Sequence, residues 1–239
     1  MTGPAAERAA TTADVVDRLR AIDTTSLVDA GGDLRVLPAE LRPVGRSRRL
    51  AGGVVTADAQ ADLMSVIAGL AACGPGDVLV VAAGGYERAV AGELFATEAL
   101  RRGLGGLVID GRCRDSAVLA ELELPVFARG MAPHAYPARA LPRIQTPIMV
   151  GDVEVRPGDL VLGDEDGLVV GTTEAIAAVL EVAEGIQARE QRLRAAVAAG
   201  RSLFEAMNVD EHLRALQAGQ DSRLRFRELA ADDPEADRT

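Results

Sequence analysis

Three observations in the 239-residue sequence predict an α/β fold. Short apolar runs bounded by glycine, proline or aspartate recur along the chain and are typical of buried strands. Apolar residues at helical spacing lie between several of these runs, and the longest helical segment covers 174–199. The strands and helices do not alternate regularly, which argues against a doubly wound parallel sheet. We therefore expect a single α/β domain with a C-terminal helix.

The N-terminal part of the chain is expected to begin with a flexible tail, residues 1–13. Thr11 or Thr12 would cap the first helix. The arginine-rich segment 42–49 is expected to be an exposed loop. In this part of the chain, helices are expected at 14–22, 26–30 and 59–72, and strands are expected at 52–56 and 77–81.

The middle of the chain is organised around the stretch 103–130, which follows a helix expected at 89–102. The stretch is expected to contain a strand, a turn, a helix and a second strand, at 107–109, 110–111, 116–122 and 126–128. Arg112, Arg114 and Asp115 fall where the first strand gives way to the helix. Charged groups at the end of a strand and beside a helix N-terminus are well placed to hold an anion or a metal.

The C-terminal half opens with a proline-interrupted loop, 131–145, of a kind that often sets specificity. Its His134 could be a general acid, although an exposed bystander is the simpler interpretation. The turn sequence Pro-Gly-Asp before an apolar strand occurs at 157–159 and resembles the Pro-Gly-Asp at 75–77, so we expect one turn used twice. Four short strands follow, at 147–150, 153–155, 160–162 and 168–170. A long helix at 174–199 comes next, and Thr172 or Thr173 would cap it.

The composition describes an acidic globular protein. Hydrophobic residues make up 48% of the chain and the formal net charge is −10. This balance argues against direct nucleic-acid binding, because phosphate backbones attract basic surfaces. No apolar run has the length of a membrane span, residues 1–13 do not resemble a signal peptide, and two cysteines do not make a disulfide framework. A cytoplasmic protein with no membrane partner is expected.

The absence of lysine restricts the possible chemistry, since all 26 basic residues are arginines. A lysine Schiff base, covalently anchored pyridoxal phosphate and the P-loop lysine are excluded. Only two histidines, His134 and His212, are present, which excludes a multi-histidine zinc site within one chain. Any metal would be held by carboxylates, carbonyls and water, so Mg²⁺, or alternatively Mn²⁺, is favoured.

A series of motifs resembles the RraA-like family, which comprises hydroxy-oxoglutarate and carboxy-hydroxy-oxoadipate aldolases and the regulator of ribonuclease E activity. The motifs are a Gly-Gly-x-Val-x-Asp-Gly-x-x-Arg-Asp run and four shorter segments, at 105–115, 92–94, 125–130, 156–159 and 164–167. The resemblance covers about 15–208 and implies a swivelling three-layer β/β/α fold assembled as a homotrimer or hexamer. We expect a flexible tail, an aldolase domain and a C-terminal helix with an acidic tail, at 1–13, 14–208 and 209–239.

The resemblance implies that Asp115 ligates a divalent cation and that Arg114 binds the substrate carboxylate. A guanidinium suits this role because its planar fork matches a carboxylate. From the residues alone, Asp115 could instead cap the helix beginning at Ser116, and Arg114 could form a surface ion pair. Cys113 is interpreted as a packing residue, although its two arginine neighbours could lower the pKa of its thiol.

Four residues upstream, Gly92, Glu93, Leu94 and Phe95, match the family segment whose backbone N–H groups bind the keto-acid carboxylate. The first turn of a helix has unpaired donors and a favourable dipole. The side chains of Leu94 and Phe95 are expected in the core, and Glu93 either positions a metal-bound water or is simply solvated. Glu190 matches a glutamate that reaches the metal waters of a neighbouring subunit, with an exposed helix charge as the alternative.

The resulting hypothesis is a metal-dependent lyase, a class II pyruvate aldolase. It would cleave a 4-hydroxy-2-oxo acid such as 4-hydroxy-4-methyl-2-oxoglutarate to pyruvate and a carbonyl compound. Arg114 and Glu93 would be the catalytic residues, and oxaloacetate decarboxylase would be a side activity. Two alternatives stay open: a non-catalytic, protein-binding regulator of ribonuclease activity, and a family member recruited to biosynthesis with another 2-oxo acid.

Overall fold

The computed structural model describes residues 11–226. Packing divides the chain into two units, the first ending at Glu184 and the second beginning at Gly185.

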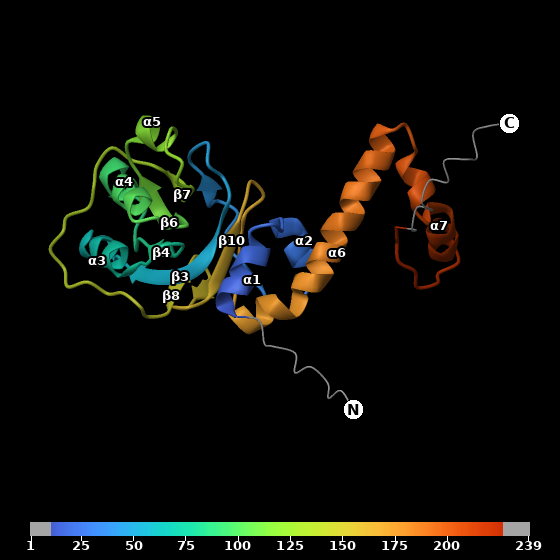
Figure 1. The fold of residues 1–239 in the computed structure, drawn as a ribbon, viewed down its shortest axis with the longest axis horizontal. Coiled ribbons are helices and arrows are strands. Elements are labelled where there is room, and N and C mark those ends of the chain that lie inside the picture. The colour runs from blue at the N-terminus through green and yellow to red at the C-terminus, as the bar shows by residue number, and fades with distance from the viewer. Residues whose placement is uncertain (1–10, 227–239) are drawn as a thin grey trace, which may run out of the picture. The chain divides into compact units, whose positions relative to one another are not determined.

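The first unit is organised around a nine-stranded mixed sheet (Figure 1). Its central strands β3, β4, β6 and β7 run parallel, and the short β5 also pairs parallel with β6. Antiparallel pairing continues the sheet through β10, β11 and β1 on one side, and through β2 on the other. The strands in order of position are β1 (Arg35–Val36), β11 (Leu168–Gly171), β10 (Leu160–Gly163), β3 (Leu50–Asp58), β4 (Val78–Ala82), β6 (Gly106–Cys113), β7 (Val126–Met131) and β2 (Arg42–Pro43), with β5 (Ala89–Ala91) beside β6.

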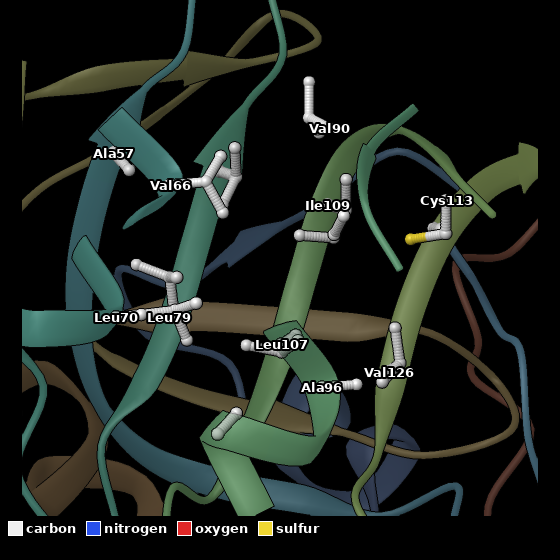
Figure 2. Close-up of a cluster of buried hydrophobic side chains, with 14 of the residues drawn as sticks. Ala57, Val66, Leu70, Leu79, Val90, Ala96, Leu107, Ile109, Cys113 and Val126 are labelled. Atoms are coloured by element: carbon white, nitrogen blue, oxygen red, sulfur yellow. The ribbon is translucent and has the colours of Figure 1, made fainter. Parts of the chain in front are cut away.

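The two faces of the parallel strands enter different cores, because successive side chains of a strand point to opposite faces. Leu79 and Val81 of β4 belong to a cluster that includes residues of three helices, α3 (Met64–Ala72), α4 (Glu93–Arg101) and α5 (Ser116–Leu119) (Figure 2). Val78 and Val80 belong to a second cluster with β11 and the hairpin β8 (Ile148–Val150)–β9 (Val153–Val155). A helical layer and a β layer therefore cover opposite faces, which confirms the three-layer β/β/α arrangement.

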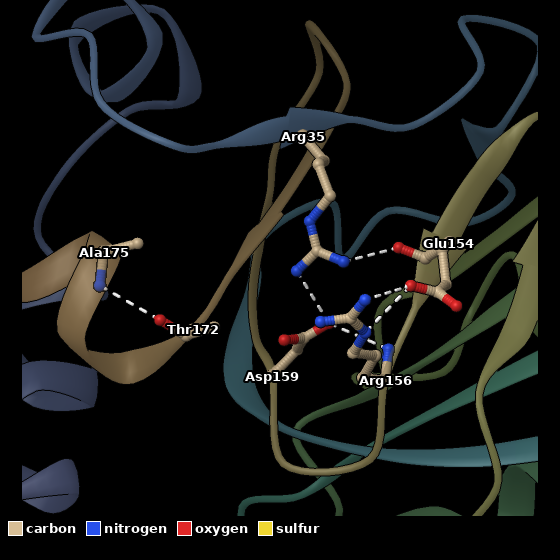
Figure 3. Close-up of polar contacts among 6 residues, drawn as sticks. All are labelled: Arg35, Glu154, Arg156, Asp159, Thr172 and Ala175. Carbon is tan, nitrogen blue, oxygen red and sulfur yellow. Dashed lines mark hydrogen bonds and ion pairs between the residues drawn. The ribbon is translucent and has the colours of Figure 1, made fainter.

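A third cluster joins the N-terminal helices to the start of the long helix. It contains apolar residues of α1 (Thr12–Leu19), α2 (Thr24–Asp29), β10 and α6 (Thr173–Ala198). The Thr11 side chain accepts from the Asp14 N–H, and the Asp14 carboxylate accepts from the Thr11 N–H, so α1 begins with a capping box. The Thr172 hydroxyl likewise accepts from the Ala175 N–H at 3.1 Å (Figure 3). Both caps confirm the sequence prediction.

The repeated Pro-Gly-Asp sequence forms the same turn twice. Asp77 Oδ2 accepts from the Gly74 N–H at 2.8 Å, and Asp159 Oδ2 accepts from the Arg156 N–H at 2.8 Å. The intervening glycines, Gly76 and Gly158, have φ of +84° and +83°, a conformation that favours glycine. The buried Asp159 also pairs with Arg35 at 2.8 Å, which ties this turn to β1 (Figure 3).

Two sequence predictions near the site are wrong. Residues 89–91 form β5 and not the first turn of a helix, because their backbone pairs with β6 and with His134 and Tyr136. Asp110-Gly111 is not a turn, and β6 continues through it. Asp110 is tolerated inside the strand because its buried carboxylate pairs with Arg129 of β7 and accepts from the Gly151 N–H at 2.8 Å.

Other boundaries also differ from prediction. Arg42–Pro43 is not loop but strand β2, since it pairs with β7. The helix expected from residue 59 begins only at Met64. Ala59 and Ala61 donate their N–H groups to the carbonyls of Ala82 and Ala83, so the β3–β4 pairing continues past the end of the strand.

The second unit contains the remainder of α6, a 3₁₀ turn (Leu203–Ala206) and α7 (Val209–Gln217). Within its described part, Leu193 and Ala206 are the buried apolar residues. The acidic tail expected at 232–235 lies outside the described residues, as do positions 1–10 of the expected N-terminal tail. The domain limits expected from the sequence remain predictions. Across residues 11–226, no helix combines the length and apolar character needed to cross a membrane.

Candidate functional site

Asp115 lies where β6 gives way to α5, and its backbone is left-handed, with φ 59° and ψ 42°. Such a conformation is uncommon for residues other than glycine, and it clusters at functional sites where the surrounding structure holds it. Here the Arg114 N–H donates to the Ala91 carbonyl at 3.0 Å, and the Asp115 carbonyl accepts from Val118 and Leu119. These bonds on both sides hold the turn and direct the Asp115 side chain toward α4.

The Asp115 carboxylate does not cap its own helix. No side-chain capping bond forms at α5, and Oδ2 instead accepts the Glu93 N–H of α4 at 3.0 Å. The capping alternative considered for Asp115 is therefore not what the structure shows. The carboxylate lies at the N-terminus of another helix, where the helix dipole favours a negative charge.

Arg114 lies beside this carboxylate, with its Nε 3.4 Å from Asp115 Oδ2. The two side chains are 43% and 36% exposed, so a ligand can reach both. Gly92 packs directly under them: a Cβ at this position would lie 2.5 Å from Asp115 Oδ2 and 2.7 Å from Arg114 Cγ. Glycine is needed here because of this close approach.

The segment from Gly92 to Phe95 forms the N-terminus of α4, as expected for a segment that binds a carboxylate through its backbone N–H groups. Not all of these N–H groups are free. The Glu93 N–H is already used by Asp115, and the Ala96 N–H closes the first turn on the Gly92 carbonyl. In the described part of the chain, this leaves the N–H groups of Leu94 and Phe95 without an acceptor. Leu94 is 74% exposed, so its side chain is not in the core as expected. Phe95 is partly buried and packs against the core cluster.

Arg114 and Asp115 line two pockets. The small pocket, about 60 Å³, lies among the side chains of Leu63, Val90, Leu94 and Phe95 and the small residues Ala89, Ala91, Gly92 and Ala135. The large pocket, about 570 Å³, is lined by Glu93, Ser116, Ala117, Val118, Met131, Ala132 and Pro133. The pair therefore lies between a small, largely apolar pocket and a larger one with an acidic residue.

The loop 131–145 supplies a wall to both pockets, and Asp62 helps to fix it. The Asp62 carboxylate accepts N–H groups from Met64, Arg139 and Ala140 at 2.7–3.1 Å. The Met64 N–H above all, and then those of Arg139 and Ala140, hold the pKa of Asp62 below its ordinary value. Asp62 was not predicted as a site residue, because it falls inside the helix expected at 59–72, whereas the observed helix begins only at Met64.

Neither Cys113 nor His134 lines the two pockets. Cys113 is fully buried beside the apolar side chains of Figure 2, and burial raises the pKa of its thiol to about 12. This confirms packing as its role, because only the thiolate is strongly nucleophilic. The His134 side chain is exposed in the loop, and its backbone carbonyl pairs with Ala89.

The donor set fits a hard divalent cation held mainly by water. Among residues 11–226, no three His, Cys, Asp or Glu side chains gather into a metal-binding group. Asp115 keeps Oδ1 in addition to the bonded Oδ2, and Glu93 shares the wall of the large pocket with it. Magnesium binds through one or two carboxylates and retains several waters, so these residues suit it. Glu190 lies on α6 in the second unit, and its expected role stays a prediction.

Comparisons with known proteins agree with this architecture. The RraA-like family model, described as Aldolase/RraA, matches residues 12–170. A Halalkalibacterium halodurans protein named "Putative 4-hydroxy-4-methyl-2-oxoglutarate aldolase" is 34% identical over 200 residues, covering 81% of this chain and 95% of the relative.

Solved structures of other proteins also match this chain. The RNA-processing inhibitor RraA from Thermus thermophilus is 33% identical, with a TM-score of 0.59 over 62% of this chain and 91% of its own. An uncharacterized protein from Pseudomonas syringae pv. tomato is 27% identical, with a TM-score of 0.70 over 81% and 96%. The matched family model and the shared fold together show that this chain belongs to the RraA-like family.

Proposed function

We propose that the protein is a divalent-metal-dependent pyruvate aldolase, a carbon–carbon lyase of class II, acting on a 4-hydroxy-2-oxo acid. The observation that carries this proposal is the meeting of Asp115, Arg114 and the N-terminus of α4 beside the two pockets. A carboxylate able to hold a cation thus lies next to a guanidinium and free N–H groups able to hold a substrate carboxylate. The name of the Halalkalibacterium halodurans relative supports an aldolase, with 4-hydroxy-4-methyl-2-oxoglutarate as an example substrate.

Each residue of the site has a distinct task in this proposal. Arg114 binds the substrate carboxylate through its planar fork, and the N–H groups of Leu94 and Phe95 add further donors. Asp115 holds the cation, Mg²⁺ or alternatively Mn²⁺, with Glu190 of a neighbouring subunit acting through water. When bound, the cation supplies the Lewis-acid chemistry that makes the 2-oxo group an electron sink.

Glu93 completes the set as the proton acceptor. In this proposal it takes the proton of the C4 hydroxyl, directly or through water. The C3–C4 bond then breaks, the C4 carbon leaves as a carbonyl compound, and C3 is protonated to give pyruvate. Oxaloacetate offers the same bond to C3, with carbon dioxide as the leaving group, so its decarboxylation is the expected side activity. We place this chemistry in a cytoplasmic homotrimer or hexamer.

A second candidate function is protein-binding regulation. It is favoured by the 33% identity to the Thermus thermophilus RNA-processing inhibitor, a protein that shares this fold. The net charge of −10 argues that such a regulator would contact a protein and not RNA directly.

The two candidates are separated by measuring pyruvate release. Purified protein is incubated with 4-hydroxy-2-oxo acids and with oxaloacetate, with and without Mg²⁺. Release that requires Mg²⁺ and is lost in Asp115→Asn supports the aldolase. No release from any acid, together with inhibition of a ribonuclease by both wild type and Asp115→Asn, supports the regulator.

A further inference from the structure

Arg112 lies in β6, two residues before Arg114, and its side chain connects segments on both sides of this strand. Its backbone pairs with Ala89 of β5 and with Gly130 of β7, so these two strands flank β6 on opposite sides. The Arg112 Nε donates to the carbonyl of Tyr86, which precedes β5. Its Nη1 donates to the carbonyl of Met131, the last residue of β7, at 2.9 Å.

The backbone pairing around Arg112 is irregular on both sides. The β5–β6 register shifts between Ala89 and Ala91, and the β6–β7 register shifts between Ile109 and Arg112. Such a shift disrupts the ladder of hydrogen bonds locally. The Arg112 guanidinium supplies two hydrogen bonds where the ladder is interrupted, and bonds from an ionised donor are stronger than neutral ones.

Both connected segments lead to walls of the site. The chain runs from Tyr86 into β5, which lines the small pocket, and then into the N-terminus of α4. Met131 itself lines the large pocket. Because Arg114 and Asp115 line both pockets, the Arg112 guanidinium joins one wall to the other across the strand that leads to this pair.

Tyr86 is also held through its ring. The guanidinium carbon of Arg129 lies 5.2 Å from the centre of the Tyr86 ring, a cation–π contact. Arg129 in turn pairs with the buried carboxylate of Asp110. Different arginines therefore hold the backbone and the ring of Tyr86, and substitution can separate the two contacts.

We propose that Arg112 is a positioning residue for the carboxylate-binding part of the site. This inference rests on the proposed aldolase function and deepens it. In the described part of the chain, Arg112 lines neither pocket and donates to backbone carbonyls, so it acts through the segments that it connects. Without it, the N-terminus of α4 and the Met131 wall can shift relative to Arg114. The substrate carboxylate then loses donors in the ground state and the transition state alike, which raises KM and leaves kcat nearly unchanged.

The kinetic test compares Arg112→Ala with Arg102→Ala. Arg102 is the matched control, because its Nη2 also donates to two backbone carbonyls, at the opposite end of α4 from the site. Arg112→Ala should raise KM for a 4-hydroxy-2-oxo acid about tenfold and keep kcat within about twofold. Arg102→Ala should leave KM unchanged. An equal change of KM in both variants, or an unchanged KM in Arg112→Ala, overturns the inference.

Arg112→Lys separates the connection from the charge, and it also carries the test if Arg112→Ala does not fold. Lysine keeps the positive charge but lacks the fork that reaches two carbonyls, so KM should stay at least about threefold above the wild-type value. Full recovery of KM would show that the charge alone acts, and it overturns the inference. Tyr86→Ala removes the ring contact and keeps the carbonyl that Arg112 uses. A larger rise of KM in Tyr86→Ala than in Arg112→Ala would assign the positioning to the ring and overturn the role of Arg112.

Hydrogen exchange followed by mass spectrometry tests the positioning without turnover. Arg112→Ala should exchange about tenfold faster than wild type in peptides covering 86–95 and 129–134, whereas Arg102→Ala should not. Unchanged exchange in both segments overturns the inference and leaves the aldolase function standing. No pyruvate release by the wild type overturns the aldolase function, whereas faster exchange in these segments would still support the connection that Arg112 makes.

Discussion

The Asp115 carboxylate accepts the backbone N–H of Glu93 at 3.0 Å, although 22 residues separate the two in the sequence. The bond joins the end of β6 to the first residue of α4. It orients Asp115 toward the pockets and leaves Oδ1 available to a cation.

Removal of divalent metal should abolish activity. Asp115 is the one protein ligand that we propose to contact the cation directly, so binding should be weak and reversible. EDTA should stop pyruvate release, and Mg²⁺ or Mn²⁺ should restore it. Asp115→Asn should be inactive with an unchanged circular dichroism spectrum. Full turnover in excess EDTA would contradict the metal-dependent mechanism.

Replacing Arg114 by lysine should reduce catalysis while keeping the charge. Lysine lacks the planar fork, and a lost charge-assisted hydrogen bond costs about 1.5–3 kcal/mol, or about 10- to 100-fold in kcat/KM. Steady-state kinetics measure the effect. Arg101→Lys is the control, because Arg101 is exposed on α4 and pairs only with Glu98 among the described ion pairs. An unchanged kcat/KM in Arg114→Lys would show that Arg114 is a surface charge.

Gly92→Ala should damage the site through sterics. Its Cβ would lie 2.5 Å from Asp115 Oδ2, so the carboxylate must move, and such overpacking costs about 1–3 kcal/mol. We expect lower activity and a lower free energy of unfolding, measured by urea titration. Gly185→Ala is the control: its Cβ meets nothing within 4 Å, and alanine in a helix should stabilise by about 0.5–1 kcal/mol. Full activity in Gly92→Ala would mean that Arg114 and Asp115 need not occupy their present positions.

Asp62 should make stability depend on acid pH. Its pKa in the folded state is lowered, chiefly by the Met64 N–H, so its contribution is present above the unfolded pKa and is lost as pH falls through the folded pKa. At pH 7, Asp62→Asn should therefore have a lower Tm than the wild type. The difference in Tm between the two proteins should become smaller as the pH falls below about 4. Differential scanning fluorimetry across pH 3–7 measures this. A difference in Tm that does not change with pH would exclude a role for the Asp62 charge.

Mixed oligomers should reveal whether the site is shared between subunits. If Glu190 serves a neighbour's site, Asp115→Ala and Glu190→Ala should each be nearly inactive alone. After subunit exchange, interfaces that pair an intact Asp115 with an intact Glu190 should restore part of the activity, because a closed ring has head-to-tail interfaces. Native mass spectrometry verifies the exchange. Mixed oligomers without activity would show that Glu190 does not serve a neighbouring site.

The sequence by itself determined the features that depend on local chemistry. The Thr11 and Thr172 caps and the repeated Pro-Gly-Asp turn follow from short-range hydrogen bonds, which particular residue types make at fixed spacing. The motif at 105–115 also indicated the family, and with it the site residues Arg114 and Asp115.

Only the tertiary structure decided the features that depend on pairing between distant segments. Residues 89–91 have a helical pattern but form a strand, because pairing with β6 satisfies their backbone groups. Asp110 resembles a turn residue but lies inside β6, where Arg129 of the adjacent strand neutralises it. The contact of Asp115 with Glu93 and the apolar walls around Arg114 likewise arise from sheet register and helix placement. Residue periodicity reports which face of an element is buried, whereas register determines which distant group meets it.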